Sequence, residues 1–117
     1  MTKEVMIGEK AVTLRASALT SVRYKALFGS DLIKDFKSID GNTYENTDIM
    51  AQIAYVMALQ GVGSDFTVAS IDTFYSWLDQ FEPMDILNAG DEIMNVYAKG
   101  AQTSSVPKKK NAGRSAN

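Results

Sequence analysis

The segment from Ile49 to Gln60 constrains the fold more than any other part of the chain. Only Gln52 and Gln60 are polar in this stretch, and apolar residues recur in it at the 3.6-residue period of a helix. A helix that is apolar nearly all round is buried on most of its sides. We therefore predict a central helix here, with Ile53 and Met57 in the core. The residues on its main stripe are Ile49, Met50, Ile53, Val56, Met57 and Gln60.

The first fifteen residues have the pattern of a β-hairpin. Val5 and Ile7 alternate with polar neighbours, and Val12 and Leu14 do the same after a short segment that contains Gly8. We predict two short antiparallel strands joined by a small loop.

Capping signals divide the next region into two helices. Ser17 is a favourable first-turn cap, and Gly29 is a favourable terminator. Ser30 or Asp31 can cap a second, shorter helix, and the residues from Asp40 to Asn42 predict a turn. The apolar residues expected to face the core are Leu19, Val22, Ala26 and Leu27 in the first helix and Leu32, Ile33 and Phe36 in the second.

Two further helices are predicted after the central one, which Gly61 and Gly63 should end. Ser70 caps a helix that we expect to reach Pro83, with Ile71, Phe74, Tyr75, Leu78 and Phe81 on one stripe. The last helix is expected to end at Gly100, and its stripe contains Ile86, Leu87, Ile93, Met94 and Tyr97.

Two residues of these helices need a separate interpretation. Gly90 lies inside the last helix, where glycine costs about 1 kcal/mol relative to alanine, and close approach of a neighbouring helix would compensate for this cost. We expect Phe74, Leu78 and Phe81 in the core. Trp77 lies off their stripe, which makes it the better candidate for a contact surface.

Together these patterns predict a mainly α-helical α+β fold, with an N-terminal hairpin and four to five helices around the central one. We expect one domain over residues 1–100. Residues 101–117 are expected to form a disordered basic tail, because their composition cannot build a core.

The residue types present narrow the classes of function. The chain has no cysteine and no histidine, which removes disulfides, thiolate metal sites and the commonest general base. The segment from Asp40 to Asp48 fails as a calcium loop, because Tyr44 and Glu45 stand where an oxygen ligand and a glycine are required. No apolar run is long enough to span a membrane. We therefore expect a soluble intracellular protein that is not an enzyme and that uses no cofactor or metal.

Charge is distributed unevenly along the chain. Residues 1–37 carry a net charge of +3, residues 38–98 carry ten acidic residues and no Lys or Arg, and the remainder carries +5, which gives the total of -2. The acidic middle could attract a basic partner or pair subunits, although an ordinary solvated face remains the alternative. We expect the partner-binding residues to include Asp72, Asp79 and Glu82 with Trp77. A helix-turn-helix here would present Asp72 and Asp79 to phosphates, so DNA binding is not expected.

Several stretches of the chain resemble a known family. The segment from Val12 to Asp35 is similar to the beginning of the tail assembly chaperones of long-tailed bacteriophages and of related prophages of Gram-positive bacteria. Further similar stretches are Ala54–Gln60 and Phe74–Ile86, followed by a polar tail with a lysine run. The residues that fit the first pattern are Arg23, Tyr24, Phe28, Gly29, Asp31, Leu32 and Asp35.

The resemblance implies an assembly factor of the host cytoplasm that is absent from the mature virion. Such a factor would bind the tape-measure protein, help to recruit tail-tube subunits, and bind neither nucleic acid nor membranes; self-association is a further expectation. The alternative is a small structural head–tail connector or completion protein of the virion.

The lysine run, Lys108, Lys109 and Lys110, has a second interpretation at the level of the gene. Three lysine codons can form a run of adenines on which a ribosome slips, and members of the family resemble this case, since many are made in a short and a longer frameshifted form. We expect Lys108–Lys110 to mark such a site. The alternative is a solubilising tail without slippage.

Overall fold

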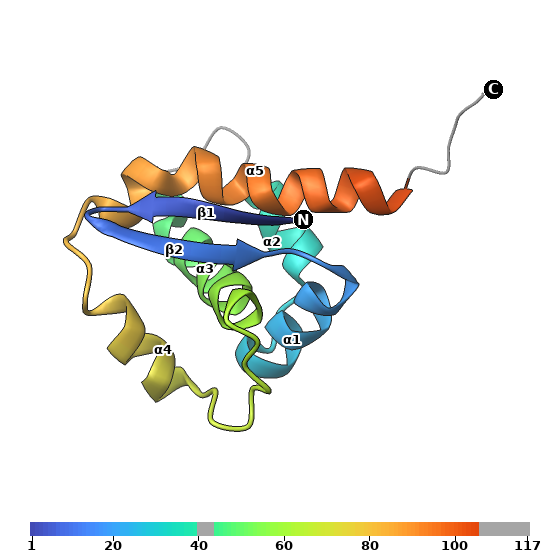
Figure 1. The fold of residues 1–117 in the computed structure, drawn as a ribbon, viewed down its shortest axis with the longest axis horizontal. Coiled ribbons are helices and arrows are strands. Elements are labelled where there is room, and N and C mark those ends of the chain that lie inside the picture. The colour runs from blue at the N-terminus through green and yellow to red at the C-terminus, as the bar shows by residue number, and fades with distance from the viewer. Residues whose placement is uncertain (40–43, 106–117) are drawn as a thin grey trace.

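The computed structural model describes residues 1–39 and 44–105 and has the predicted mainly α-helical α+β fold (Figure 1). An antiparallel hairpin opens the chain, and helices pack beneath, beside and along it. The turn predicted from Asp40 to Asn42 lies outside the described residues. In chain order the elements are β1 (Thr2–Ile7), β2 (Lys10–Arg15), α1 (Ala18–Phe28), α2 (Leu32–Ser38), the short 3₁₀-helix η1 (Tyr44–Asn46), α3 (Thr47–Gly61), α4 (Ile71–Leu78) and α5 (Asp85–Ser105).

The hairpin has the predicted position, and one of its faces is buried. Val5 pairs with Val12 in the antiparallel register, and Ile7 pairs with Lys10. Val5, Ile7 and Leu14 are buried, because alternate side chains of a strand point to the same face. Gly8 has a φ of +61°, a conformation that favours glycine, and it makes the tight connection between the strands possible.

The predicted capping residues begin and end the helices as expected. Ser17 and Ser70 accept hydrogen bonds from backbone N–H groups in the first turns of α1 and α4, and each forms a capping box. Asp31, rather than Ser30, caps α2. Gly29 adopts the left-handed conformation with a φ of 73° and closes α1.

Helix α3 is the central helix, as predicted, and nine of its fifteen residues are buried. It packs against β2, α5 and α1, and Ile53 and Met57 have no exposed surface. Gly61 is the last residue of α3, and a Cβ atom there would collide with the backbone carbonyl oxygen of Thr13. Gly61 is thus needed for the close approach of α3 to the hairpin, whereas Gly63, with a φ of 75°, adopts the left-handed conformation that follows the helix end.

Helix α5 lies along the hairpin and over α3, and it continues to Ser105, five residues past the predicted end (Figure 1). Gly90 lies close to α3, since a Cβ atom there would lie 2.7 Å from the Sδ atom of Met50. The close helix contact predicted at this glycine is therefore present. At Gly100 a Cβ atom would lie 2.9 Å from the Cβ of Ala16, so this glycine permits packing and does not end the helix.

The face of α1 that packs on the core is only partly the predicted one, because Leu27 packs on the core but Ala26 is exposed. Leu19 and Val22 are 43% and 60% exposed, whereas Thr20 and Tyr24 are fully buried. The buried Thr20 hydroxyl donates to Oε1 of Gln60 at 2.7 Å, and Nε2 of Gln60 donates to the Ser17 hydroxyl at 3.1 Å. Helix α1 therefore packs with a polar face, because the end of α3 supplies partners for its hydroxyl groups.

Two other expectations about buried faces need correction. In α2, Leu32 is buried but Ile33 is 51% exposed. Helix α4 ends at Leu78, before Pro83 is reached, so Phe81 lies after the helix and packs on the core only partly.

Candidate functional site: an acid-rimmed groove beside α4

A groove lies between α4, the beginning of α3 and the segment that leads into α5. Its volume is about 440 Å³, which is within the range of ligand pockets. We call this feature the α4 groove. It is lined by Thr47, Asp48, Ala51, Tyr75, Leu78, Asp79, Phe81, Glu82, Pro83 and Ile86.

The inner part of the α4 groove is apolar. Ala51 of α3 and Ile86 of α5 are buried there, and Leu78 and Phe81 are half-buried. Tyr75 forms part of the wall and remains 61% exposed. A large aromatic side chain beside an open apolar surface is typical of sites that contact another protein.

A cluster of aromatic rings holds α4 against α3. Phe74 packs on Tyr55 and Phe28 with ring centroids 5.3 and 5.1 Å apart, and Trp77 packs on Tyr55 and Phe81 at 5.4 and 5.0 Å. The hydroxyl groups of Tyr55 and Thr73 are 2.8 Å apart and form a hydrogen bond. The position of Tyr75 therefore rests on a packed scaffold.

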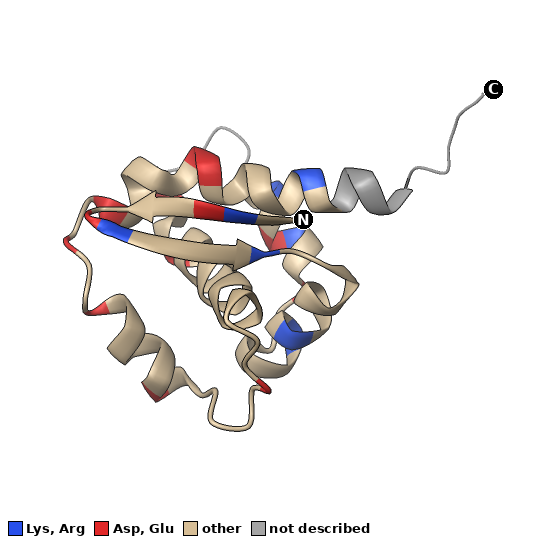
Figure 2. Cartoon of the chain, in the orientation of Figure 1, with Lys and Arg blue, Asp and Glu red and all other residues tan. Residues whose placement is uncertain are grey.

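Three exposed carboxylates, from Asp48, Asp79 and Glu82, line the α4 groove. Figure 2 shows acidic residues and no basic ones on α4, as expected from a sequence without Lys or Arg between residues 38 and 98. Within the described parts of the chain the one ion pair, at 3.6 Å, joins Lys3 to Glu92 on another side of the molecule. The rim thus carries negative charge that no ion pair among the described residues neutralises.

Local helix electrostatics explain some of the acids near the groove but not all of them. Asp48 and Asp72 lie in the first turns of α3 and α4, where a negative charge is favourable. Asp79 is the C-terminal cap residue of α4, where a negative charge is unfavourable, and no basic residue is present in the last turn. Glu82 lies in the connection to α5. The helix dipoles therefore do not account for Asp79 and Glu82. Binding of a cationic partner would explain why these two positions are acidic.

The predicted partner-binding residues occupy different positions around α4. Asp79 and Glu82 line the groove, and Asp72 is exposed in the first turn of the helix. Trp77 is half-buried on the inner side, between Tyr55 and Phe81, so it contributes to the support of the groove. The exposed aromatic residue of α4 is Tyr75, which lies on the apolar stripe of the helix and was not among the predicted partner-binding residues. Binding through these residues stays a prediction.

The residues that carry the family resemblance gather where α1 turns into α2. Tyr24 is buried, and its hydroxyl lies 2.8 Å from Oδ2 of Asp35 and 2.9 Å from Oε1 of Gln52. Burial, together with the hydrogen bond to Asp35, raises the pKa of the Tyr24 hydroxyl. The ring of Phe28 packs on Tyr24, with centroids 5.2 Å apart. Gly29 and Asp31 cap the two helices, and Leu32 is buried.

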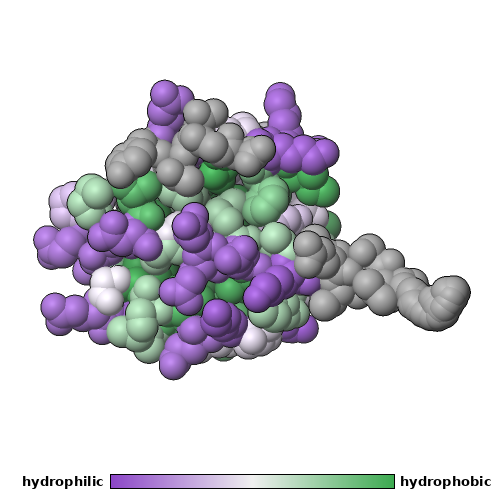
Figure 3. Space-filling view, turned by 90° about the horizontal axis from the view of Figure 1, so that it is seen from above, coloured by the Kyte–Doolittle hydropathy of each residue, from purple (hydrophilic) through white to green (hydrophobic). Residues whose placement is uncertain are grey.

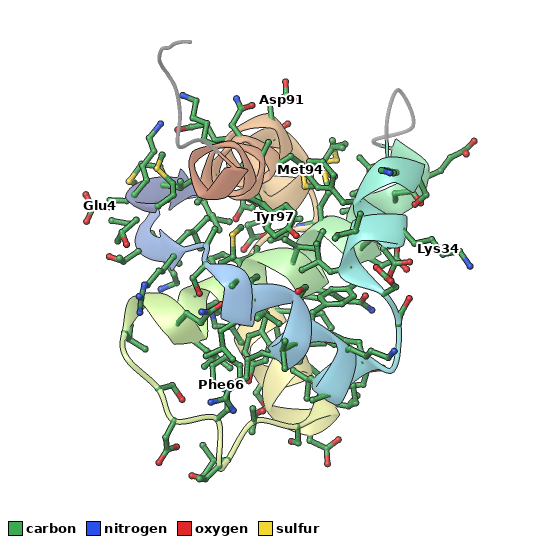
Figure 4. The ribbon with its side chains drawn as sticks, turned by 90° about the vertical axis from the view of Figure 1, so that its right-hand side faces the viewer. Glu4, Lys34, Phe66, Asp91, Met94 and Tyr97 are labelled. Carbon is green, nitrogen blue, oxygen red and sulfur yellow. The ribbon has the colours of Figure 1, made fainter. Side chains whose placement is uncertain are left out.

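Arg23, the remaining residue of this set, holds the loop between α3 and α4. Its guanidinium carbon lies 4.5 Å from the centroid of the Phe66 ring, and Phe66 has a φ of 67°, an uncommon conformation for this residue type (Figure 4). The buried Nε of Arg23 has no hydrogen-bond partner in the described structure. The residues of the resemblance therefore all have packing or capping roles at this corner.

The described residues were also inspected for metal sites and for membrane-spanning helices. No group of three or more acidic side chains is close enough to hold a metal ion, and no helix is both long and apolar enough to cross a membrane. The face formed by α5 and the hairpin carries many hydrophilic side chains with apolar ones between them (Figure 3). Lys108, Lys109 and Lys110 lie outside the described residues.

The chain was also compared with known proteins. No protein-family model, curated protein or solved structure matches it.

Proposed function

We propose that this protein is a phage tail assembly chaperone that binds the tape-measure protein and helps to recruit tail-tube subunits. It would act in the host cytoplasm and leave the tail before the virion is complete. Support comes from the resemblance of nearly the whole chain to that family, including the segments Val12–Asp35 and Phe74–Ile86.

The observation that carries the proposal is the α4 groove. A chaperone of a long helical protein needs an open apolar surface on which one face of a helix can lie. Tyr75 is exposed beside such a surface, and Asp79 and Glu82 lie at its rim without an ion pair in the described residues. This arrangement suits protein binding.

Co-expression with the tape-measure protein tests the proposal. The soluble fraction of the tape-measure protein is expected to rise in the presence of this chain, and the two proteins are expected to co-purify at low salt. A variant with Ile53→Asp, which places a charge in the core, is the matched loss-of-fold control. Equal solubility of the tape-measure protein with and without the chain would contradict the chaperone function.

The alternative function is a small structural head–tail connector or completion protein. Mass spectrometry of purified particles separates the two functions, because a chaperone is absent from the particle and a connector is present at a ring-like copy number. The gene supplies a further test of the chaperone reading. We propose a slippery sequence at the codons of Lys108–Lys110, with an overlapping reading frame and a minor longer product in infected cells.

A further inference from the structure

We propose that the α4 groove binds an amphipathic helix whose apolar ridge is flanked by Lys or Arg. This inference rests on the proposed function, because it states the chemistry of the segment that the chaperone would recognise. The surface is the α4 groove, and the proposed ligand is a basic amphipathic helix.

The apolar part of the groove determines which side chains the bound helix must carry on its ridge. Ala51, Leu78, Phe81 and Ile86 provide an apolar floor, and Tyr75 stands beside it with most of its surface in water. Large apolar side chains spaced three and four residues apart on a helix can fill such a floor from one face. Covering Tyr75 would also remove an exposed aromatic surface from water.

The rim determines the charge of the partner. Asp79 faces the unfavourable end of the α4 dipole, and Glu82 follows it in the exposed connection. Among the residues that the structure describes, no Lys or Arg lines the groove, and the sequence has none between residues 38 and 98. These carboxylates would attract a cationic side chain of a partner, whereas they would repel an acidic helix. Charge complementarity therefore selects a basic helix.

The chain's own lysine run does not reach this groove in the same molecule. Helix α5 has 21 residues and spans about 30 Å, and the groove lies at its first turn, beside Ile86. Lys108–Lys110 follow Ser105 by three to five residues, which cover at most about 18 Å when fully extended. The three lysines therefore cannot occupy the α4 groove of their own molecule. Binding of the tail of a second copy is one outcome of the test below.

Binding of synthetic helical peptides to the full chain, followed by fluorescence anisotropy, tests the inference. The probe is a peptide with Leu and Phe at i, i+3, i+4 and i+7 and with Lys on both flanks. One comparison peptide carries Glu in place of Lys, and another carries Ala in place of the apolar ridge. We expect the basic peptide to bind at least about tenfold more tightly than either comparison peptide at low salt, and we expect high salt to weaken its binding.

Variants of the groove assign the binding to this surface. Asp79→Asn with Glu82→Gln is expected to weaken binding of the basic peptide about tenfold and to reduce its salt dependence. Tyr75→Ala is expected to weaken binding by a similar factor, and Tyr75→Phe should retain it. The matched control is Glu4→Gln with Asp91→Asn, which removes two exposed carboxylates from the parts of the molecule opposite α4 (Figure 4). This control should bind within about twofold of the unchanged chain.

Four outcomes would overturn the inference. These are equal binding of the acidic peptide, unchanged binding by the groove variants, an equal loss in the control variant, and a concentration-dependent mass in gel filtration that Asp79→Asn with Glu82→Gln abolishes. The last result would assign the groove to a second copy of the chain.

The proposed function and this inference fail in different ways. If the groove variants still solubilise the tape-measure protein as well as the unchanged chain does, the chaperone function stands and the groove inference is wrong. If the basic peptide binds in the groove but the tape-measure protein gains no solubility, the groove inference stands and the chaperone function is wrong.

Discussion

Helices α3 and α4 have similar proportions of apolar residues, but the fold covers them to very different extents. Nine of the fifteen residues of α3 are buried, whereas Phe74 is the one buried residue among the eight of α4. Helix α3 is enclosed by the hairpin, α1 and α5, whereas α3 is the main neighbour of α4 at the edge of the molecule (Figure 1). Apolar periodicity predicts that a helix has a face to bury. It does not predict that the same chain will cover that face.

This difference gives the two helices different expected roles. Substitutions in α3 should change the free energy of unfolding. Substitutions on the open side of α4 should leave it almost unchanged and alter binding.

The largest effect is expected for Ile53→Ala in α3. Ile53 has no exposed surface, so the substitution removes buried apolar contacts and leaves a cavity. We expect the free energy of unfolding to fall by about 2–5 kcal/mol, measured by urea denaturation. A loss below about half a kilocalorie would show that α3 is not the central helix.

Gly61→Ala should be the next most destabilising change. Alanine is normally the better helix residue, but a Cβ atom at this position would collide with the carbonyl oxygen of Thr13. We expect a net loss of about 1–3 kcal/mol in the free energy of unfolding. Gly29→Ala is a useful comparison, because no neighbouring atom lies near that position and the cost comes from its φ of 73° alone. If Gly61→Ala stabilises the protein, α3 and β2 are less closely packed than described.

Tyr24→Phe removes hydrogen bonds to Asp35 and Gln52 while keeping the ring contact with Phe28. We expect a loss of about 1–2 kcal/mol near neutral pH. The substitution should also change the pH dependence of stability. Burial raises the pKa of the folded Tyr24 above its ordinary value of 10.0, so below pH 10 both states keep the proton and its contribution is fully present.

Above pH 10 the unfolded tyrosine loses its proton while the folded one retains it. The free energy of unfolding therefore falls by up to about 1.4 kcal/mol per pH unit from this group. Tyr24→Phe should reduce that slope, although Tyr97, whose pKa burial also raises, still contributes. Urea denaturation at neutral and alkaline pH measures both effects. Identical slopes for the two proteins would contradict the burial of the Tyr24 hydroxyl.

The smallest effect is expected for Tyr75→Ala on the open side of α4. The side chain is 61% exposed, so we expect the free energy of unfolding to change by less than about 0.5 kcal/mol. The same variant should weaken binding of the basic helical peptide about tenfold. A large destabilisation would mean that Tyr75 belongs to the core, and the contrast between α3 and α4 would then disappear.

The parts of the fold that follow from local chemistry could be predicted from the sequence. Ser17, Gly29, Asp31 and Ser70 act within their own turns, and the alternation in the hairpin needs no distant contact. The core face of α1 could not be predicted in this way. Thr20 is buried because Gln60, forty residues away, accepts its hydrogen bond, and a single sequence does not reveal such a pair.

The candidate site could be predicted only in part, for a related reason. Asp79 and Glu82 were recognisable as acids in a region without cations, and both line the groove. Tyr75 was recognised as part of the apolar stripe of α4, but it was not predicted to be the exposed aromatic residue of the site. Its exposure depends on where the helix ends and on the lack of a second covering element, which are tertiary properties. The exposed position of Tyr75 could have been suspected by comparing the number of apolar residues in α4 with the number of elements able to cover them.

The hydrogen bonds of Gln60 imply how the molecule opens. The Ser17 hydroxyl caps the first turn of α1 and also accepts a hydrogen bond from the end of α3, so the start of α1 and the end of α3 share one polar cluster. The start of α1 is thereby tied to the most buried helix and should not fray independently. In hydrogen exchange the amide protons of Ser17 and Leu19 should exchange through the same opening event as those of α3, with one common free energy of opening, and those of α4 should exchange earlier.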